Sequence, residues 1–331
     1  MDQTGMTIIR KETRFSRMFG DYRGILPSLL FLFLFGIIFF SSDSSASQST
    51  FQLFAKRMVP LGLLALGLYP VMICNYIDLS QFATAQLTST VAILLINDGM
   101  IAQFTIPIMF FIGVTIGLIN GLVISHLRIH PILVTYCMGM ILKGIMFIST
   151  KGRMVLISQK DVFHFWRQDI LGFPVTLIGF LILFLLLTYM MGSTILGRKF
   201  LALGGNRSAS YFSGIGIHRI EILSFMISSV MSTIAGFATI VVSMSVSTGL
   251  DLSVDLRAIV ILILGGTTFR QKGRPVGILT GLLVYGILES GLMHFGIPAH
   301  IHQLIKGSVL LSVIMINALL HRSRSGSTEN S

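Results

Sequence analysis

The sequence predicts an all-α integral membrane protein with about ten transmembrane helices. Apolar residues make up 53% of the 331 residues and charged residues only 11%, whereas a soluble domain carries roughly a quarter charged residues. Several apolar stretches reach the ~18 residues that a helix needs to cross a bilayer. The lysines and arginines lie mainly in short segments between these stretches, where they orient membrane helices.

Ten apolar segments are expected to span the membrane. The third and the eighth are short or interrupted by polar residues, as in helices that are buried in protein or line a cavity. The expected limits are 25–41, 58–76, 82–96, 101–125, 131–149, 171–191, 221–244, 256–266, 276–293 and 304–320. The membrane domain therefore covers residues 25–320, between a basic N-terminal segment (1–24) and a short tail (321–331).

The first apolar run follows a polar, basic segment and extends from Ile25 to Phe40. The residues after it, Ser44-Ser45-Ala46, faintly resemble a signal cleavage site. The leading segment is long and contains acidic residues, which signal peptides avoid. We therefore expect an uncleaved first helix.

The charge distribution predicts that both termini are cytoplasmic. With the N-terminus inside, more than half of the 24 lysines and arginines fall in cytoplasmic segments, the asymmetry that orients membrane proteins. The 150–170 loop, placed outside by this topology, argues the other way because it carries four positive residues: Lys151, Arg153, Lys160 and Arg167. Because the positive charge follows this membrane pattern, the net charge of +11 does not indicate nucleic-acid binding.

A weak internal repeat is visible. Gly117-Leu-Ile-Asn-Gly121-Leu resembles Gly277-Ile-Leu-Thr-Gly281-Leu, and a Lys-Gly pair follows each, at Lys143 and at Lys306. Internal repeats of this kind are common in transporters. The sequence therefore predicts two weakly repeated helical halves.

The loop from 192 to 219 is unusually long, basic and well patterned for a connection between two spans. Gly204 and Gly205 followed by Asn206 indicate a tight turn into a short helix, and Gly214 indicates its end. The exposed face of this helix would combine Tyr211 and Phe212 with Asn206 and Ser213, which suits a groove on a partner protein. A plain surface loop with positive-inside arginines is the alternative that the pattern alone leaves open.

The motif Ala202-Leu-Gly-Gly-Asn206, with Ser213-Gly-Ile215 downstream, is similar to the ribose-type sugar permeases of bacterial ABC importers. The resemblance runs from about residue 58 to residue 318. Further matches are Gly117-Leu-Ile-Asn-Gly121, Leu127-Arg-Ile129 with Pro131, Ile77-Asp-Leu-Ser80, Ala258-Ile259, Leu264-Gly-Gly-Thr267, Gly273-Arg274 and Gly277.

The resemblance implies ten transmembrane helices per subunit and a place in the bacterial inner membrane. It also implies two permease subunits, identical or different, two ATPase subunits and a periplasmic substrate-binding protein. The 198–219 segment would then hold the helix that couples the permease to its ATPase. The coupling residues would be Gly204, Gly205, Asn206, Tyr211, Phe212, Ser213 and Gly214.

Nucleotide chemistry is expected in the partners of this chain. The sequence has no G-x-x-x-x-G-K-[ST] phosphate loop, so it lacks a Walker-type ATP site. If the chain is an ABC permease, ATP and Mg²⁺ bind to the separate ATPase subunits. We expect this chain to be a transport subunit that has no catalytic residues and binds no cofactor.

The chain departs from the family around Ile77-Asp-Leu-Ser80. The family usually has two glycines before this element and Val-Gly after it, where this chain has Asn75-Tyr76 and Gln81-Phe82. Glycines there would allow close helix approach, and the larger side chains would fill that space. Arg257 stands where an acidic residue is common, and Thr268-Phe-Arg-Gln-Lys272 replaces a glycine-rich run. Topology and coupling should survive these changes, whereas the solute and the partner permease stay open.

Polar residues inside the membrane are candidate functional residues. Asp78, Ser80 and Asn120 are expected to line the translocation path, although Asp78 alternatively caps the start of the next helix. Glu289 is expected to form an intramembrane ion pair with Arg257 or Lys306. The only plausible carboxylates for ion-driven transport are Asp78 and Glu289.

The histidines and cysteines give no strong metal signal. His294, His300 and His302 cluster in the last outer loop without an accompanying carboxylate or cysteine, so we interpret them as a polar periplasmic rim rather than a metal site. Cys74 and Cys137 lie in apolar stretches and are expected to be small core residues.

Two other functional classes remain as alternatives. A secondary transporter driven by an ion gradient would move its solute without ATP. A membrane-embedded enzyme is disfavoured because no nucleophile, base and orienting group recur together.

Overall fold

The computed structural model describes residues 48–159, 162–247, 253–267 and 273–294, with short stretches at 297–298, 301–302, 304–305, 307–308 and 311. Helices account for nearly all of the secondary structure in these residues. They are α3 (Gln48–Ile73), α4 (Gln81–Asn97), α5 (Ala102–Leu127), α6 (Pro131–Thr150), α7 (His164–Arg167), α8 (Val175–Ser193), α9 (Ile195–Gly205), α10 (Arg207–Phe212), α11 (Ile217–Ser243), α12 (Ser253–Leu264) and α13 (Val276–His294).

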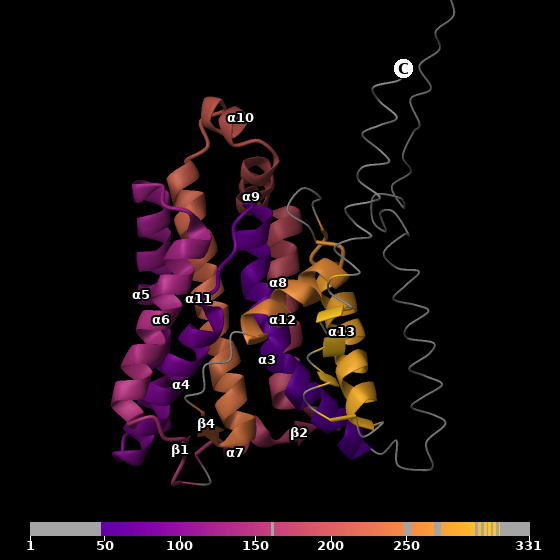
Figure 1. Cartoon of the computed structure of the whole chain (residues 1–331). Helices are drawn as coiled ribbons and strands as arrows, with labels where there is room; N and C mark the ends of the chain where they lie inside the picture. Colours follow the sequence, from indigo (N-terminus) through magenta and orange to yellow (C-terminus); the bar gives the residue numbers. More distant parts are fainter. Residues whose placement is uncertain are drawn as a thin grey trace, which may run out of the picture.

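Four two-residue strands form two small antiparallel ladders. They are β1 (Val155–Leu156), β2 (Asp169–Ile170), β3 (Phe173–Pro174) and β4 (Ser245–Val246). β1 pairs with β4, and β2 pairs with β3. The β1–β4 ladder ties the connection after α6 to the connection after α11, at one end of the helical bundle (Figure 1).

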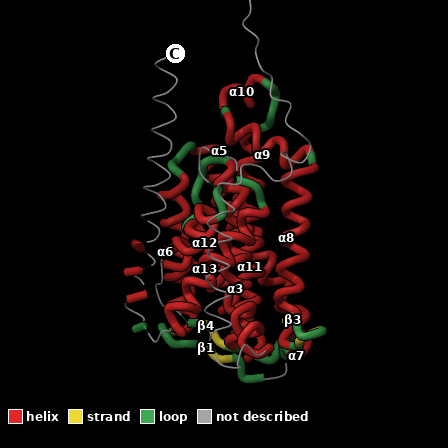
Figure 2. Tube along the Cα trace, turned by 90° about the vertical axis from the view of Figure 1, so that its right-hand side faces the viewer, coloured by secondary structure: helices red, strands yellow, loops and turns green. Residues whose placement is uncertain are grey.

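The long helices run along a common direction, with α9 and α10 at one end and the strands and α7 at the other (Figures 1 and 2). α11 packs against α3, α4 and α5, while α3 also packs against α8, α12 and α13. α3 and α11 therefore connect the two sides of the bundle. The 150–170 loop and the 192–219 loop lie at opposite ends, as the expected alternation of spans requires.

The all-α fold class is confirmed. Within the described residues, α3, α5, α6, α8 and α11 are each long and apolar enough to cross a membrane. α4 and α12 have only 17 and 12 residues, as expected for the third and eighth spans. Helices occupy every expected span from 58–76 to 276–293. The span at 25–41 and most of 304–320 lie outside the described residues, so the total of ten stays a prediction.

α3 begins ten residues before the expected limit of 58, at Gln48. Lys56 and Arg57 are charged and lower the hydropathy just before residue 58, so the apolar span was expected to begin after them. Lys56 Nζ lies 3.1 Å from Asp169 Oδ1 at the β2 strand. This ion pair allows a charged turn to extend the helix beyond its apolar part.

The repeated glycine motifs have the same structural role. A Cβ atom at Gly121 would lie 2.7 Å from the Ile222 Cα atom of α11, and one at Gly281 would lie 1.9 Å from the Ile261 carbonyl oxygen of α12. Each motif thus lies where two helices approach too closely for any side chain. This shared role supports the predicted similarity of the two halves.

Apolar side chains face outward on α5, α6 and α8. Phe111, Ile148 and Leu185 are among the most exposed. An apolar outer surface is expected of helices that contact lipid or another membrane subunit. Cys74 is buried as predicted, but Cys137 is exposed on α6, so its interpretation as a core residue is wrong. The apolar residues around Cys137 in the sequence belong to the outer surface of the bundle and not to the core.

Candidate functional site

The segment between α3 and α4, residues 74–80, is here called the α3–α4 linker, and it ends in a buried carboxylate. Asp78 is 1% exposed. Its Oδ1 atom accepts hydrogen bonds from the Ser80 N–H (2.9 Å) and from Ser80 Oγ (2.6 Å). Its Oδ2 atom accepts from Ser228 Oγ of α11 at 2.6 Å. These donors compensate for the removal of the carboxyl group from water.

The same hydrogen-bond network extends to the neighbouring helices. Asn120 Nδ2 of α5 donates to Ser80 Oγ at 2.9 Å, and Gln81 Nε2 of α4 donates to Ser228 Oγ at 2.9 Å. We call Asp78, Ser80, Gln81, Asn120 and Ser228 the buried polar cluster. Every member is at most 1% exposed. The structure thus brings the predicted residues Asp78, Ser80 and Asn120 together, in a conformation that is closed to solvent.

Asp78 also contributes to the start of α4, as the capping alternative expects, because its Oδ1 atom accepts from the N–H of Ser80, the residue directly before this helix. A further donor, the Phe82 N–H in the first turn of α4, donates to Asp255 Oδ1 of α12 at 2.8 Å. Asp255 therefore caps α4 from a distant part of the chain. Sequence reasoning missed this residue because capping was sought only among near neighbours.

The loop from 192 to 219 contains two short helices rather than one. α9 begins after Thr194, whose Oγ1 accepts from the Gly197 N–H at 3.2 Å. Asn206 then caps α10, because its Oδ1 accepts from the Ala209 N–H at 2.9 Å. Gly214, with a φ of +74°, follows the last turn of α10. The predicted short helix is present, but it has only six residues.

Gly204 and Gly205 form the last turn of α9 rather than a turn outside a helix. Gly205 has no positive φ, so a left-handed backbone conformation is not the reason for a glycine there. Gly204 has a packing role, because a Cβ atom on it would lie 1.7 Å from the Ile73 carbonyl oxygen. Its own carbonyl accepts a hydrogen bond from Asn75 Nδ2 at 2.8 Å. α9 is therefore packed directly on the end of α3.

α10 extends beyond the ends of the long helices and presents two aromatic rings (Figure 1). Tyr211 is 69% exposed and Phe212 87% exposed, and their ring centroids lie 5.7 Å apart in an edge-to-face arrangement. Asn206 and Ser213 are also exposed. This combination matches the face that the sequence predicts for a helix that docks on a partner.

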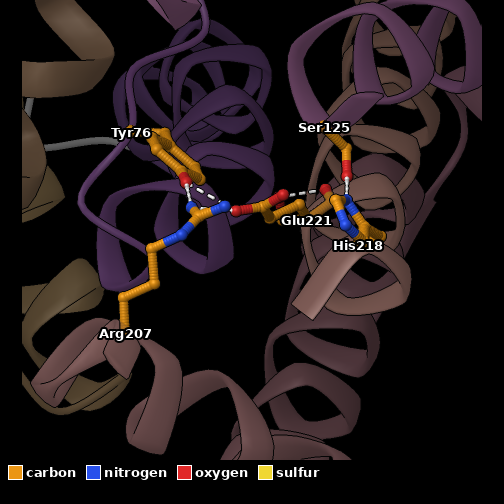
Figure 3. Close-up of polar contacts among 6 residues, drawn as sticks. Tyr76, Ser125, Arg207, His218 and Glu221 are labelled. Atoms are coloured by element: carbon orange, nitrogen blue, oxygen red, sulfur yellow. Dashed lines mark hydrogen bonds and ion pairs between the residues drawn. The ribbon is translucent and has the colours of Figure 1, made fainter. Parts of the chain in front are cut away.

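An ion pair between a half-exposed arginine and a buried glutamate joins α10 to α11 (Figure 3). Glu221, in the first turns of α11, is 1% exposed. Its Oε1 atom accepts hydrogen bonds from Arg207 of α10 and from Tyr76 Oη of the α3–α4 linker, the latter at 2.6 Å. Arg207 also donates to Tyr76 Oη. Burial, with the hydrogen bond to Glu221, raises the pKa of the Tyr76 phenol, which keeps it in the neutral, donating form.

Sequence reasoning missed this triad of Tyr76, Arg207 and Glu221. Arg207 was interpreted as one of several orienting arginines, and Glu221 was the first residue of an expected span. A buried carboxylate at a span boundary, with an arginine in the preceding loop, was the available signal. Asp255 and Glu221 also correct the view that Asp78 and Glu289 are the only plausible intramembrane carboxylates, since both are buried within helices.

A second pair of polar residues lies beside the triad in Figure 3. Ser125 Oγ of α5 and His218 Nδ1 of α11 are 2.6 Å apart. The His218 ring also stacks on His126, with centroids 5.2 Å apart. These contacts fasten the end of α5 to the start of α11.

A cavity of about 290 Å³ lies near the strand end of the bundle, between α3, α11, α12 and α13. Arg257 and Glu289 both line it, together with Arg57. Lys306, the other predicted partner of Glu289, lies outside the described residues. The ion pair of Glu289 stays a prediction, now with Arg57 as a further cation at the same cavity.

The predicted histidine rim is only partly described. His302 is buried, with 8% exposure, so it does not belong to an open polar rim. His300 and the side chain of His294 lie outside the described part of the chain. Among the residues that the structure does describe, no group of three or more His, Cys, Asp and Glu could hold a metal ion.

Comparison with known proteins gives the family of the chain. Residues 51–314 match the family described as "Branched-chain amino acid transport system / permease component". The chain belongs to this family. It is therefore a membrane permease component of a transport system, and the membrane-embedded enzyme is excluded as its main function.

Several characterised permeases resemble this one. The ribose import permease protein RbsC of Escherichia coli strain K12 is 29% identical over 262 residues, which cover 77% of this chain and 81% of that protein. The L-arabinose ABC transporter permease protein AraH of Azospirillum brasilense is 24% identical over 300 residues, covering 89% and 88%. The autoinducer 2 import system permease protein LsrC of Photorhabdus luminescens is 26% identical over 309 residues, covering 92% of each. No solved structure matches the permease.

Proposed function

We propose that this permease is the membrane subunit of an ABC importer that moves a sugar or sugar-like solute across the inner membrane by ATP-driven alternating access. The observation that carries the proposal is α10, a capped helix that projects from the bundle with Tyr211 and Phe212 exposed. A projecting apolar face of this kind suits a groove on a soluble partner. The ribose and arabinose permeases among its relatives favour a sugar as the solute.

The proposed orientation puts the α10 end in the cytoplasm. Arg198, Lys199, Arg207 and Arg219 lie in the loop at this end, which agrees with the positive-inside rule. Both termini would then be cytoplasmic, and the strand end would face the periplasm. A periplasmic substrate-binding protein would deliver the solute at the strand end, and ATPase subunits would dock at α10.

ATP would drive transport through the position of α10. Closure of the ATPase subunits would pull the two short helices, and the bundle would change from outward-open to inward-open. ATP and Mg²⁺ would bind to the ATPase subunits, since this chain has no phosphate loop. The second permease subunit, the same chain or a different one, would pack on an exposed apolar face of the bundle.

An ion-driven secondary transporter is the other candidate, and the family and the relatives do not favour it. It would transport solute without an ATPase. The buried carboxylates Asp78, Glu221 and Asp255 are the side chains that such a mechanism would need. In this structure each of them accepts hydrogen bonds from fixed donors, which suits a structural role better than repeated ion binding.

The proposed function predicts that changes on α10 uncouple ATP hydrolysis from transport. The permease would be reconstituted in proteoliposomes with its cognate ATPase and binding protein, and uptake of D-ribose, L-arabinose and D-allose would be measured. We expect Tyr211→Asp and Phe212→Asp to leave the permease folded, because both side chains are exposed. Uptake per ATP hydrolysed should fall, because a charge on the docking face opposes its burial.

Leu171→Asp is the matched control. Leu171 is an apolar residue that is 93% exposed, but it lies between β2 and β3, at the opposite end from α10 (Figure 1). This variant should keep the ATPase bound through purification. If the two α10 variants assemble with the ATPase and transport at the wild-type rate, the docking assignment is wrong. Uptake that continues without ATPase would instead indicate a secondary transporter.

A further inference from the structure

Two consecutive residues of the α3–α4 linker form hydrogen bonds to the 192–219 loop. Asn75 Nδ2 donates to the Gly204 carbonyl at the end of α9, and Tyr76 Oη bonds to Arg207 of α10 and to Glu221. Asn75 has a φ of +64°, a conformation that few residues other than glycine adopt easily.

The other end of the linker is bonded to the buried polar cluster. The Leu79 N–H donates to Thr135 Oγ1 of α6 at 3.1 Å, and Asp78 accepts from Ser228 of α11. Ser80 accepts from Asn120 of α5. Residues 78–80 are therefore fixed to three helices within the membrane domain.

The distance along the chain between these two attachments is very short. Tyr76 and Asp78 are separated only by Ile77, and a fully extended chain spans at most ~3.6 Å per residue. Few backbone torsions therefore separate the two attachments. We expect a movement of α10 by a few ångströms either to break the hydrogen bonds of Tyr76 or to move Asp78.

Helix α11 provides a parallel connection on one face. Glu221, Phe225 and Ser228 are four and three residues apart, so they lie on the same side of α11. The Tyr76 ring stacks on Phe225, with centroids 6.3 Å apart. The linker thus lies along two turns of α11, from the ion pair at Glu221 to the cluster at Ser228.

The Arg207–Glu221 ion pair opposes separation of α10 from α11. Glu221 is 1% exposed, while the Arg207 side chain is about half exposed. Withdrawal of Arg207 would leave a buried carboxylate with only neutral donors, which is strongly unfavourable. Movement of α10 is therefore expected to take Glu221 and Tyr76 with it.

We propose that the α3–α4 linker transmits movement of α10 to the buried polar cluster, and that Asn75, Tyr76, Arg207 and Glu221 are the positioning residues for this coupling. The proposal rests on the proposed ABC function, in which α10 is the part that the ATPase moves. It assigns the cluster a definite role. The cluster is the membrane-side end of the connection and changes its packing when α10 moves.

The first test measures solute taken up per ATP hydrolysed in the reconstituted complex, with whichever of D-ribose, L-arabinose and D-allose the wild type transports. Tyr76→Phe removes one hydroxyl group and keeps the stacked ring. Glu221→Gln removes the charge and keeps the shape. We expect both variants to retain ATPase binding and ATP hydrolysis, with uptake per ATP lowered by about fivefold or more, the lower bound of typical coupling effects.

Matched variants separate coupling from simple stability. Arg207→Lys keeps a positive charge and should recover most of the uptake per ATP that Arg207→Gln loses. Arg198→Gln, which changes an exposed arginine of α9 whose side chain, among the described residues, donates to the nearby Ser193 carbonyl, should behave as wild type. A purely structural ion pair would instead lower the amount of folded protein while leaving uptake per ATP unchanged in what remains.

The second test uses Cys74 as a natural reporter and needs no ATPase. Cys74 begins the linker and is buried, so in a Cys137→Ser background it should react slowly with a maleimide. Tyr76→Phe and Glu221→Gln should each accelerate its labelling by about fivefold or more, if they release the linker. Arg198→Gln should not.

The two tests distinguish the proposals. If the wild-type complex shows no ATP-driven uptake of any of the three sugars, these sugars are not its solutes, and the Cys74 test alone decides whether the linker is held by Tyr76, Arg207 and Glu221. Wild-type labelling of Cys74 in both variants would then overturn the inference. If the complex transports normally and both variants keep the wild-type uptake per ATP, the linker does not transmit the movement.

Discussion

At the scale of single residues, the buried carboxylates account for the arrangement of the interior. Asp78 collects donors from its own linker and from α11, Asp255 caps α4, and Glu221 binds Arg207. Each satisfies a polar group that lipid cannot satisfy. The sequence marked Asp78 through its motif, but it gave no sign of Ser228, because a serine on an apolar helix is common and its partner lies 150 positions away.

Ser228→Ala tests the cluster. The variant removes one donor to Asp78 and the acceptor of Gln81, so we expect the free energy of unfolding to fall by ~1–3 kcal/mol. Ser229→Ala is the control, because Ser229 is equally buried and its Oγ has no hydrogen-bond partner among the described residues. Unfolding in mixed detergent micelles would measure both. Equal stability of the two variants would contradict the role of Ser228.

Variants of Gly204 and Gly205 test whether glycine is required there by close packing or by backbone conformation. Gly204→Ala places a methyl group against the Ile73 carbonyl, so we expect ~1–3 kcal/mol of destabilisation. Gly205 is exposed and has no positive φ, so Gly205→Ala should be tolerated. Thermal unfolding of the purified variants gives the comparison. Comparable losses at both positions would show that the close approach to α3 is not what requires glycine.

At the scale of elements, the sequence predicted the apolar helices better than the polar ones. The spans expected at 82–96 and 131–149 differ from α4 and α6 by at most one residue at each end, because hydropathy changes abruptly there. The start of α3 and the division of the 192–219 loop into two helices were missed. Charged residues extend α3, and a glycine pair ended α9 where a turn outside any helix was expected.

The N-cap of α10 contributes to the stability of that short helix. Asn206→Ala removes the acceptor for the Ala209 N–H, and such a loss costs ~1 kcal/mol of helix stability. A helix of six residues has little other support. We expect faster amide exchange across α10 and weaker binding of the ATPase.

Asn206→Asp preserves the capping oxygen and serves as the control for this prediction. Its amide exchange across α10 should match that of the wild type. If Asn206→Ala leaves both exchange and ATPase binding unchanged, α10 is held by its contacts with α11 rather than by its cap.

At the scale of the whole molecule, the interior is organised around α3 and α11, and the outer surface is apolar on α5, α6 and α8. Sequence periodicity cannot separate these environments in a membrane protein, because lipid-facing and core-facing residues are equally apolar. This is why Cys137 was expected in the core but lies on the surface. Relationships between distant residues, such as Arg207 with Glu221, likewise require the fold.

The orientation of the whole molecule is tested by labelling from each side of the membrane. In a background that carries both Cys74→Ser and Cys137→Ser, single cysteines would replace Ser158 and Ser213, which are exposed in segments at opposite ends of the bundle, and Ser325 in the C-terminal tail. An impermeant maleimide should label Ser158→Cys in intact spheroplasts, and the other two only in inverted vesicles, because the positive loops face the cytoplasm. Labelling of Ser158→Cys and Ser213→Cys from the same side would contradict the arrangement of the bundle. If Ser325→Cys were labelled with Ser158→Cys, only the location of the C-terminus would be wrong, and α10 would still face the ATPase.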